Sequence, residues 1–373
     1  MNAELNEKVE ELINKQVSEG NQIGIQVSAY KYGKQIVNTW AGTMGPNDPR
    51  PVKQDSLFCS WSTTKGVAAT ALHILADRGQ IEYDVPVSEY WPEFGKHGKD
   101  KLTVAQAMSH QAGIYKSPNL EDLKNETDWE RGLRFVENAV PAFEPGTATG
   151  YHGLTYAWIV GGIIQKATGL HIRNVIREEI AEPLGIADEM YVGIPDGVED
   201  RLTTLKIWDP SKFVIPEGHP FYEAMPDIWW STINDMRVRK ACIPSANGHF
   251  TANALAKMYG ALANGGEIDG VRLMSPGRIE KMTRLMSDDM DVVLGMVSRK
   301  GIGFSLGGLG EESFGPRESS FGHGGAGGSV GFADPDVGLS IGVTLNKMVN
   351  AMTPEENRTL EICELIRNEL GVN

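Results

Sequence analysis

The chain has 373 residues, more than one hydrophobic core usually organises, so we expect two lobes and, between them, a cleft of the kind that binds small molecules. Its formal net charge of −14 argues against nucleic acid or an anionic membrane as a partner, because either requires a basic surface. The charged start of the chain and the lack of an apolar run of membrane-spanning length predict a cytoplasmic enzyme without a secretory signal.

The chain opens with the patterns of a helix and a β-hairpin. Apolar residues at helical spacing predict a helix over 5–13, and two alternating segments, 24–30 and 35–41, predict strands on either side of a turn. From Ser62 to about Met290 the helical pattern dominates. Its clearest helices span 154–167, 172–180 and 252–264, the last with Thr251 as its N-cap.

The last part of the chain returns to strands and closes with a helix. Its predicted strands span 293–298, 302–306, 329–333 and 338–345. A capping box that begins at Thr353 opens a final helix, which runs to Leu370. These elements predict an α+β fold, in which an antiparallel sheet is flanked by the terminal helices and a mostly helical lobe is inserted. The α/β lobe would comprise about 1–61 and 291–373, and the helical lobe about 62–290.

The cysteines and histidines show no pattern of metal binding. Cys59, Cys242 and Cys363 are widely spaced and odd in number, which predicts reduced thiols rather than a disulfide framework or a zinc site. No pair among the eight histidines has the spacing of metal ligands. We therefore predict no metal site.

A serine and a lysine three residues apart form the most informative motif of the chain. Ser62 and Lys65 stand at the start of a predicted helix, where residues three apart are neighbours. The lysine amine can then accept the serine proton if burial keeps it neutral, and the first helical turn offers unpaired N–H groups to an oxyanion. The same spacing recurs at Ser28 and Lys31, but a strand pattern there places the two side chains on opposite faces. We therefore assign the nucleophile to Ser62.

Two later segments complete a recognisable set. A turn-rich loop, 145–153, carries Tyr151 just before a helix, and a glycine-rich run, 321–329, carries His323 into a strand. Taken in order, the Ser-x-x-Lys helix, the loop tyrosine and the His-x-Gly strand resemble the serine β-lactamase-like family. That family includes class C β-lactamases, low-molecular-weight penicillin-binding proteins and family VIII carboxylesterases. The resemblance covers nearly the whole chain and implies a β-lactamase/transpeptidase-like fold.

The resemblance implies a role for each motif residue. Ser62 would be the nucleophile, Lys65 its partner, and Tyr151 a general base and proton shuttle, with the choice between Lys65 and Tyr151 as the acylation base left open. A lysine cation would lower the pKa of the tyrosine and a phenolate would raise that of the lysine, so we expect the two to titrate as a coupled pair. The backbone N–H groups of Ser62 and Ala326 would form the oxyanion hole. This mechanism implies no organic cofactor.

Two positions depart from the pattern of class C β-lactamases. Gly153 stands where those enzymes carry the asparagine of Tyr-x-Asn. His323, which the resemblance places with Gly325 beside the substrate, replaces the lysine of Lys-Thr-Gly, a cation that helps to hold a substrate carboxylate. Both changes favour neutral esters over anionic β-lactams and D-alanyl termini. We therefore predict an esterase that forms an acyl-enzyme on Ser62 and retains at most weak β-lactamase activity.

Two alternative functions and several candidate residues stay open. An acyltransferase would use the same acyl-serine intermediate, and a catalytically inactive relative would serve as a binding or structural protein. An apolar acyl pocket is one interpretation of the aromatic side chains Tyr222, Trp229 and Trp230. The other is that they pack in the hydrophobic interior of a lobe. His110 and His152 have no role in the motif, so we predict a structural or supporting role for them.

Overall fold

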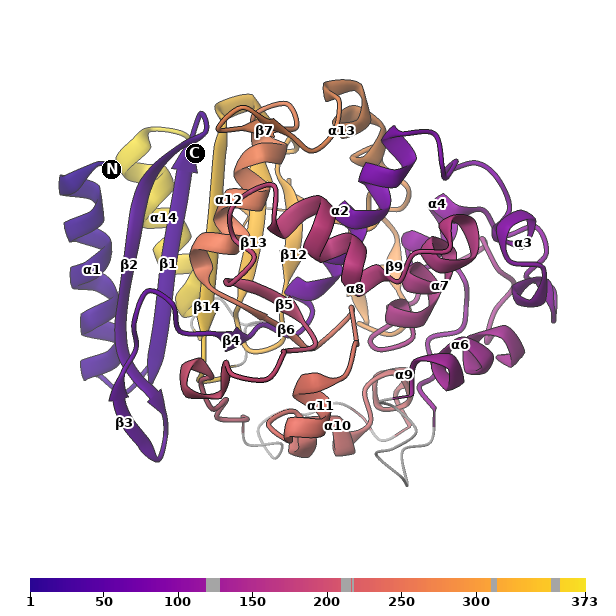
Figure 1. Cartoon of the computed structure of the whole chain (residues 1–373), viewed down its shortest axis with the longest axis horizontal. Coiled ribbons are helices and arrows are strands. Elements are labelled where there is room, and N and C mark those ends of the chain that lie inside the picture. Colours follow the sequence, from indigo (N-terminus) through magenta and orange to yellow (C-terminus); the bar gives the residue numbers. More distant parts are fainter. Residues whose placement is uncertain (119–127, 209–215, 217, 310–313, 350–355) are drawn as a thin grey trace.

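An antiparallel sheet of seven strands, in the order β11-β12-β13-β14-β1-β2-β3, forms the centre of the fold. The computed structural model describes residues 1–118, 128–208, 216, 218–309, 314–349 and 356–373. The strands of this sheet are β1 (Gly24–Lys31), β2 (Lys34–Gly45), β3 (Asp48–Pro51), β11 (Ser305–Leu306), β12 (Phe321–Gly324), β13 (Val330–Asp334) and β14 (Leu339–Leu345). Strands from the two ends of the chain meet in the middle of the sheet, where β1 pairs with β14 and Val27 lies opposite Val343 (Figure 1).

Helices cover both faces of this sheet. The terminal helices α1 (Ala3–Ser18) and α14 (Arg358–Leu370) pack together against one face, as Figure 1 shows at its left-hand side. Helix α12 (Ala252–Ala263) packs against β1, β13 and β14 on the other face. Small residues permit this contact, because a Cβ at Gly342 would lie 2.4 Å from the carbonyl oxygen of Ala252. The predicted α+β fold with an antiparallel sheet and flanking terminal helices is confirmed.

Helix α12 belongs to the range 62–290 that the sequence assigns to the helical lobe, yet it packs on the sheet. The segment between β4 (Phe58–Cys59) and β9 (Met290–Asp291) therefore contributes to both layers. The boundaries of the two lobes stay a prediction, and we propose that the α/β lobe also includes α12.

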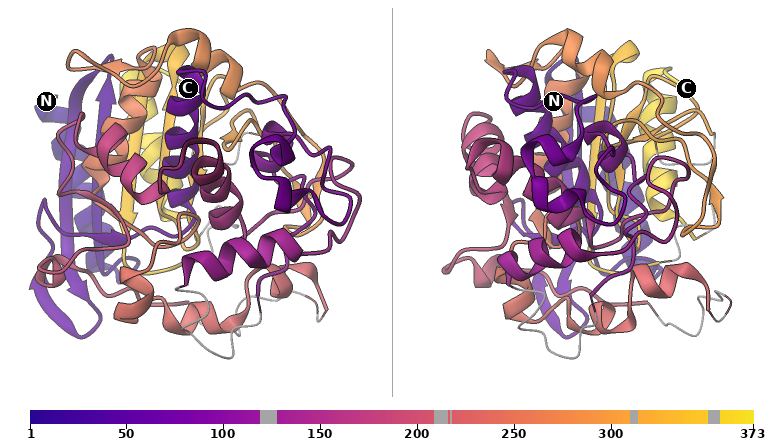
Figure 2. Two further views of the ribbon diagram at one scale, coloured as in Figure 1. Left: turned by 45° about the vertical axis from the view of Figure 1, so that its right-hand side comes forward. Right: turned by 90° about the vertical axis from the view of Figure 1, so that its right-hand side faces the viewer.

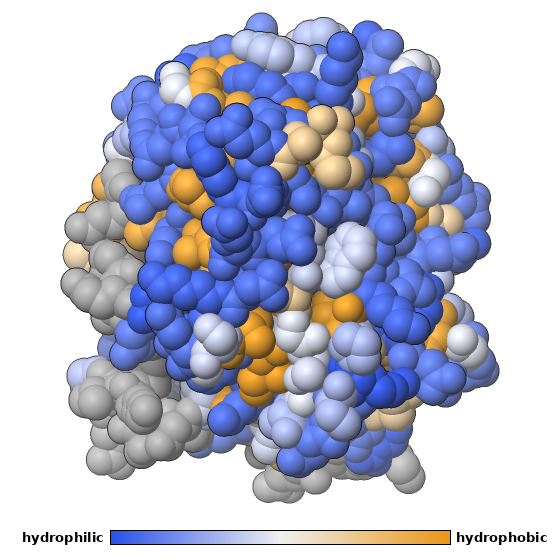
Figure 3. Space-filling view, turned by 90° about the vertical axis from the view of Figure 1, so that its left-hand side faces the viewer, coloured by the Kyte–Doolittle hydropathy of each residue, from blue (hydrophilic) through white to orange (hydrophobic). Residues whose placement is uncertain are grey.

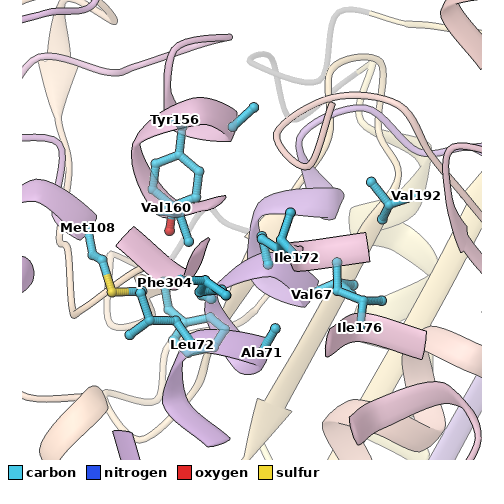
Figure 4. Packing of buried hydrophobic residues seen from close by; sticks show 14 of the residues in the cluster. Val67, Ala71, Leu72, Met108, Tyr156, Val160, Ile172, Ile176, Val192 and Phe304 are labelled. Carbon is cyan, nitrogen blue, oxygen red and sulfur yellow. The ribbon is translucent and has the colours of Figure 1, made fainter. Parts of the chain in front are cut away.

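The remaining helices form a second group together with α2 (Thr63–Asp77), which is buried along nearly its whole length. These helices are α3 (Val87–Tyr90), α4 (Val104–Met108), α6 (Trp129–Asn138), α7 (Tyr156–Thr168), α8 (Ile172–Val175), α9 (Pro220–Ala224), α10 (Asp227–Thr232), α11 (Met236–Lys240) and α13 (Pro276–Met282). Helix α2 packs against α7 on one side and β12 on the other (Figure 2). Figure 4 shows Val67, Ala71 and Leu72 of α2 among apolar side chains from α4, α7 and α8. Because its neighbours hold α2 on all sides, residues at its start have a fixed orientation.

Three smaller sheets and a few single turns complete the chain. The strands are β4 (Phe58–Cys59), β5 (Met190–Val192) and β6 (Gly248–Phe250) in one sheet, β7 (Glu267–Ile268) with β8 (Val271–Arg272), and β9 (Met290–Asp291) with β10 (Met296–Val297). The turns are 3-10 helices at Pro92–Gly95, Glu199–Arg201 and Pro335–Val337 and a π-helical turn at Ile176–Ala181. Strand β4 leads directly into the turn before α2.

The sequence places several elements well and misjudges others. Thr251 caps α12 by accepting a hydrogen bond from the backbone N–H of Ala254, as predicted. The predicted strand 293–298 is wrong, because the chain reverses at Gly295 (φ +69°) and forms the β9–β10 hairpin instead. The strand predicted at 302–306 is reduced to the two residues of β11. The capping box at Thr353 lies outside the described residues, and α14 begins after Asn357, whose side chain accepts from the N–H of Leu360.

All three cysteines are buried and carry free thiols, as the sequence predicts. Burial raises the pKa of the Cys59 and Cys242 thiols to about 11 and that of Cys363 to about 12. The thiols are therefore protonated at neutral pH and are poor nucleophiles. Within the described part of the chain, no group of His, Cys, Asp and Glu side chains has an arrangement that could hold a metal ion.

The face of the molecule that carries α1 is mainly hydrophilic, with small separate apolar patches (Figure 3). Its composition follows from the amphipathic pattern of α1, which buries Leu5, Val9 and Ile13 and turns its charged residues outward. None of the helices that the structure describes is both long and apolar enough to cross a membrane.

Candidate active site

Ser62 lies at the entrance to α2, with its hydroxyl unused by the helix. Its backbone is already helical (φ −69°, ψ −8°), and its side chain makes no capping hydrogen bond. The preceding residue, Trp61, has φ +45°, a left-handed conformation that is uncommon for a bulky side chain. The ring of Trp61 is buried and packs against that of Trp230 at 4.8 Å, which holds this strained turn in place. The turn leaves the Ser62 hydroxyl available for chemistry.

Lys65 lies one helical turn further on, and its amine is completely buried. Its Nζ lies 3.0 Å from Ser62 Oγ and 2.8 Å from each of two carbonyl oxygens, those of Gly153 and Ser245. Burial holds the pKa of Lys65 well below 10.5, and the charge of Lys300 lowers it further. A neutral amine has two hydrogens and one lone pair. In this neutral form, donation of both hydrogens to the carbonyls would turn the lone pair towards the Ser62 hydroxyl, where it could accept the proton.

Tyr151 reaches Ser62 from the loop before α7. Its hydroxyl forms a hydrogen bond with the Ser62 side chain, and its ring lies 4.8 Å from Lys65 Nζ. Burial raises the pKa of Tyr151 well above 10, the bond to Ser62 lowers it and Asp291 raises it. The net shift is upward because burial outweighs the lowering that a lysine cation would cause, and the coupled titration of Lys65 and Tyr151 stays a prediction. Tyr151 therefore keeps its proton at neutral pH.

His323 lies on β12 beside the same group of residues and is also neutral. Its pKa is held well below 6.5, first of all by burial. Its Nδ1 lies 2.7 Å from the carbonyl oxygen of Gly324, and its ring lies 6.3 Å from that of Tyr151. The position that carries a lysine in Lys-Thr-Gly enzymes is thus occupied by an uncharged side chain.

The glycine-rich run lies tightly against the start of α2. A Cβ at Gly325 would lie 2.2 Å from the carbonyl oxygen of Ser60 and 2.3 Å from Ser329 Oγ, so only glycine fits there without movement. In the described part of the chain, the backbone N–H groups of Ser62 and Ala326 donate to no other protein group. Both groups are free to stabilise an oxyanion, and their assignment to the oxyanion hole stays a prediction.

Three residues that the sequence did not assign to catalysis surround Tyr151. Lys300 Nζ lies 5.6 Å from the tyrosine ring and 3.3 Å from Ser305 Oγ. Asp291 accepts the backbone N–H of Tyr151 at 3.0 Å. His110, which we predicted to be supporting, packs its ring 4.8 Å from that of Tyr151. No local pattern marks Lys300 or Asp291, because Asp291 lies in the two-residue strand β9 and Lys300 lies in the loop after β10.

Of the three side chains predicted to line an acyl pocket, one contacts a residue next to Ser62. Trp230 touches Trp61, the neighbour of Ser62, whereas Trp229 is buried in the main hydrophobic core and Tyr222 is 39% exposed. The assignment of an acyl pocket to Trp230 stays a prediction. A different apolar cluster does contain Tyr151, and the sequence missed it. Its members besides Tyr151 are Tyr115, Phe143, Ala224, Val293 and Leu294.

The whole chain resembles known proteins in sequence and in fold. The sequence profile of the family described as Beta-lactamase matches residues 9–364. The chain belongs to the beta-lactamase family. The esterase/beta-lactamase LipL of Mycobacterium tuberculosis is 33% identical to it over 354 residues, which cover 88% of this chain and 78% of LipL.

Solved structures agree with this membership of the beta-lactamase family. The crystal structure of a family VIII carboxylesterase matches with a TM-score of 0.89 and 34% identity over 98% of both chains. A penicillin-binding protein homologue from Caulobacter crescentus matches with a TM-score of 0.87 and 34% identity over 98% of this chain and 97% of its own. The predicted family and the β-lactamase/transpeptidase-like fold are confirmed, and the relatives indicate a serine hydrolase. The roles of individual residues stay predictions.

Proposed function

We propose that this beta-lactamase-family protein is a carboxylesterase that forms an acyl-enzyme on Ser62. The observation that carries the proposal is the buried Lys65 amine, which lies 3.0 Å from Ser62 Oγ with both of its hydrogens committed to carbonyl oxygens. Because burial lowers the pKa of this amine, its neutral form can serve as a general base for the serine hydroxyl. The geometry therefore favours Lys65 over Tyr151 as the acylation base, a choice that the sequence left open.

Acylation then uses each group in turn. Lys65 accepts the Ser62 proton as the oxygen attacks the ester carbonyl, and the N–H groups of Ser62 and Ala326 stabilise the oxyanion by about 3 kcal/mol per donor. Tyr151, which is protonated and hydrogen-bonded to Ser62, donates its proton to the leaving alcohol and recovers one from Lys65. Water replaces the alcohol in the second half-reaction, and the same groups carry its proton in the reverse direction.

Two features of the site favour esters over β-lactams. His323 is neutral, so it offers no permanent cation for a substrate carboxylate. Gly153 has no room for a side chain, since a Cβ there would lie 2.6 Å from Met225 Sδ and 2.9 Å from the carbonyl oxygen of Ala224. An asparagine amide at this position would therefore require the loop to move. Relatives described as an esterase and as a carboxylesterase support the same substrate class.

Intact-protein mass spectrometry after exposure to short and long acyl esters, penicillins and cephalosporins tests the proposal. We expect acyl adducts from esters, located on Ser62 by peptide mapping, and none in Ser62→Ala, which should lose at least about three orders of magnitude in turnover because the covalent route is removed. Adducts only from β-lactams would contradict the ester assignment. Addition of acceptor alcohols distinguishes hydrolysis from acyl transfer, and failure of an active-site phosphonate to label Ser62 would favour an inactive relative.

The three free thiols support a cytoplasmic location, and the acidic composition argues against nucleic acid or an anionic membrane as a partner. Fractionation of cells that express the full chain tests the location.

A further inference from the structure

Asp291 is a fully buried carboxylate beside the catalytic tyrosine, and the proposed mechanism gives it no task. One of its oxygens, Oδ1, accepts three backbone N–H groups, from Tyr151 at 3.0 Å, Val293 at 2.9 Å and Leu294 at 3.0 Å. The other oxygen, Oδ2, is buried without a hydrogen-bond partner among the described residues. Burial of a charged or polar group is costly unless its partners compensate, so such a residue is unusual in a purely structural position.

Asp291 joins two segments that are far apart in the sequence. A parallel bridge pairs it with Thr149 in the tyrosine loop, and the N–H of Val292 donates to the carbonyl oxygen of Thr149 at 2.9 Å. In the other direction, Asp291 pairs with Met296 across the β9–β10 hairpin. Together with its side-chain bonds, these contacts make the tyrosine loop and the hairpin a single unit.

The same unit also shapes the surroundings of the tyrosine ring. Val293, which is completely buried, belongs to the apolar cluster around Tyr151, and its N–H is one of those that Asp291 accepts. Loss of the carboxylate would release the backbone of Tyr151 and an apolar neighbour of its ring together.

We propose that Asp291 is the positioning residue of Tyr151: its carboxylate binds the tyrosine backbone to the β9–β10 hairpin and so holds the phenol hydroxyl at Ser62. The inference rests on the proposed function, in which Tyr151 relays the proton to the leaving alcohol. Asp291 itself touches neither substrate nor reacting atoms.

The negative charge of Asp291 has a second effect on the same tyrosine. Burial raises the pKa of Tyr151 most, the bond to Ser62 lowers it and Asp291 raises it. The other groups that face the ring are Lys65, Lys300, His110, His323 and Tyr156. Removal of the Asp291 charge alone should therefore lower the pKa of Tyr151, so that the tyrosine loses its relay proton at a lower pH than in the wild type.

Two substitutions at this position separate geometry from charge. Asp291→Asn keeps an oxygen acceptor for the three N–H groups and removes the charge, so we expect the alkaline limb of kcat to move to lower pH, with KM nearly unchanged. Asp291→Ala also removes the acceptor and should lower kcat by about 10-fold or more at every pH, since the relay loses its position. Asp289→Asn is the matched control, because it removes an equal charge from an exposed side chain of the same segment and should keep the wild-type profile.

The full chain is used throughout, with p-nitrophenyl esters as substrates and a phosphonate probe for Ser62. An Asp291→Asn enzyme with the pH profile of the wild type and an Asp291→Ala enzyme with wild-type kcat would overturn the positioning role. If Asp291→Ala does not fold, the pH profile of Asp291→Asn decides alone. If the wild-type protein hydrolyses no ester and is not labelled at Ser62, the proposed function fails and this inference fails with it. If the wild type is labelled and turns over esters normally, and both Asp291 variants retain its kcat and pH profile, only the inference is refuted.

Discussion

A methyl group added at Gly325 should disable the oxyanion hole while leaving the acid–base residues in place. The new Cβ would lie 2.2 Å from the carbonyl oxygen of Ser60, 2.3 Å from Ser329 Oγ and 2.9 Å from Thr63 Oγ1, all closer than real Cβ contacts allow. Ser60 is part of the turn before α2, so the glycine-rich run must move away from it. That movement carries the N–H of Ala326 away from the N–H of Ser62, and the two donors no longer converge on one oxygen.

The expected loss can be estimated from one displaced donor. Removal of one oxyanion donor costs about 3 to 4 kcal/mol of transition-state stabilisation, which corresponds to about 100- to 1000-fold in kcat. The crowding itself should lower the free energy of unfolding by about 1 to 3 kcal/mol. Gly324→Ala is the matched control, because the nearest atom to its Cβ is the carbonyl oxygen of Ser329 at 3.9 Å.

The assay is steady-state hydrolysis of a p-nitrophenyl ester by both variants, with urea unfolding to confirm that each one folds. We expect Gly325→Ala to lose kcat by about 100-fold or more and Gly324→Ala to retain nearly all of it. A folded Gly325→Ala enzyme with wild-type kcat would refute the assignment of the Ala326 N–H to the oxyanion hole. Equal losses in both variants would show that the run tolerates no side chain at all, and that the predicted clash is not the cause.

Three further predictions follow from the charges in the site and the core. His323→Lys should raise the ratio of penicillin to ester turnover, because it places a cation where a neutral ring now stands, and an unchanged ratio would contradict the charge argument. Lys300→Met removes a positive charge that lowers the pKa of Lys65, so the acid limb of kcat/KM should move to higher pH; a profile that does not move would show that Lys300 does not act on the base. Burial lowers the pKa of His73 to about 3 from 6.5, so the unfolded state binds the extra proton between these values and stability falls by about 1.4 kcal/mol per pH unit as pH decreases. In His73→Gln, the free energy of unfolding should lose the part of its pH dependence that comes from His73, whereas above about pH 6.5 the substitution should change stability only through packing. Urea unfolding from pH 7 downward measures this dependence. If the free energy of unfolding of the variant falls with decreasing pH as steeply as that of the wild type, the buried neutral imidazole is rejected.

Local patterns in the sequence were sufficient for the elements and for the central motif. Ser62 and Lys65 are neighbours because residues three apart on any helix are neighbours, and the helical context alone separates them from the same spacing at Ser28. The β1–β2 hairpin and the cap at Thr251 likewise depend on residues within a few positions of each other. Since the signals of turns, caps and periodicity are short-range, they can be read before any tertiary contact is known.

The tertiary structure alone decided the protonation states and the supporting residues. Burial and then the charge of Lys300 hold the pKa of Lys65 well below 10.5, and the carbonyl oxygens that receive its N–H groups, those of Gly153 and Ser245, lie 88 and 180 residues away in the sequence. Tyr151 keeps its proton because it is buried, and Asp291 reaches its backbone from 140 residues away. Burial and electrostatic contact depend on which distant segments pack together, and no periodicity within a single segment records that packing. The sequence therefore determined which groups are present in the site, and the packing of distant segments determined which of them are charged.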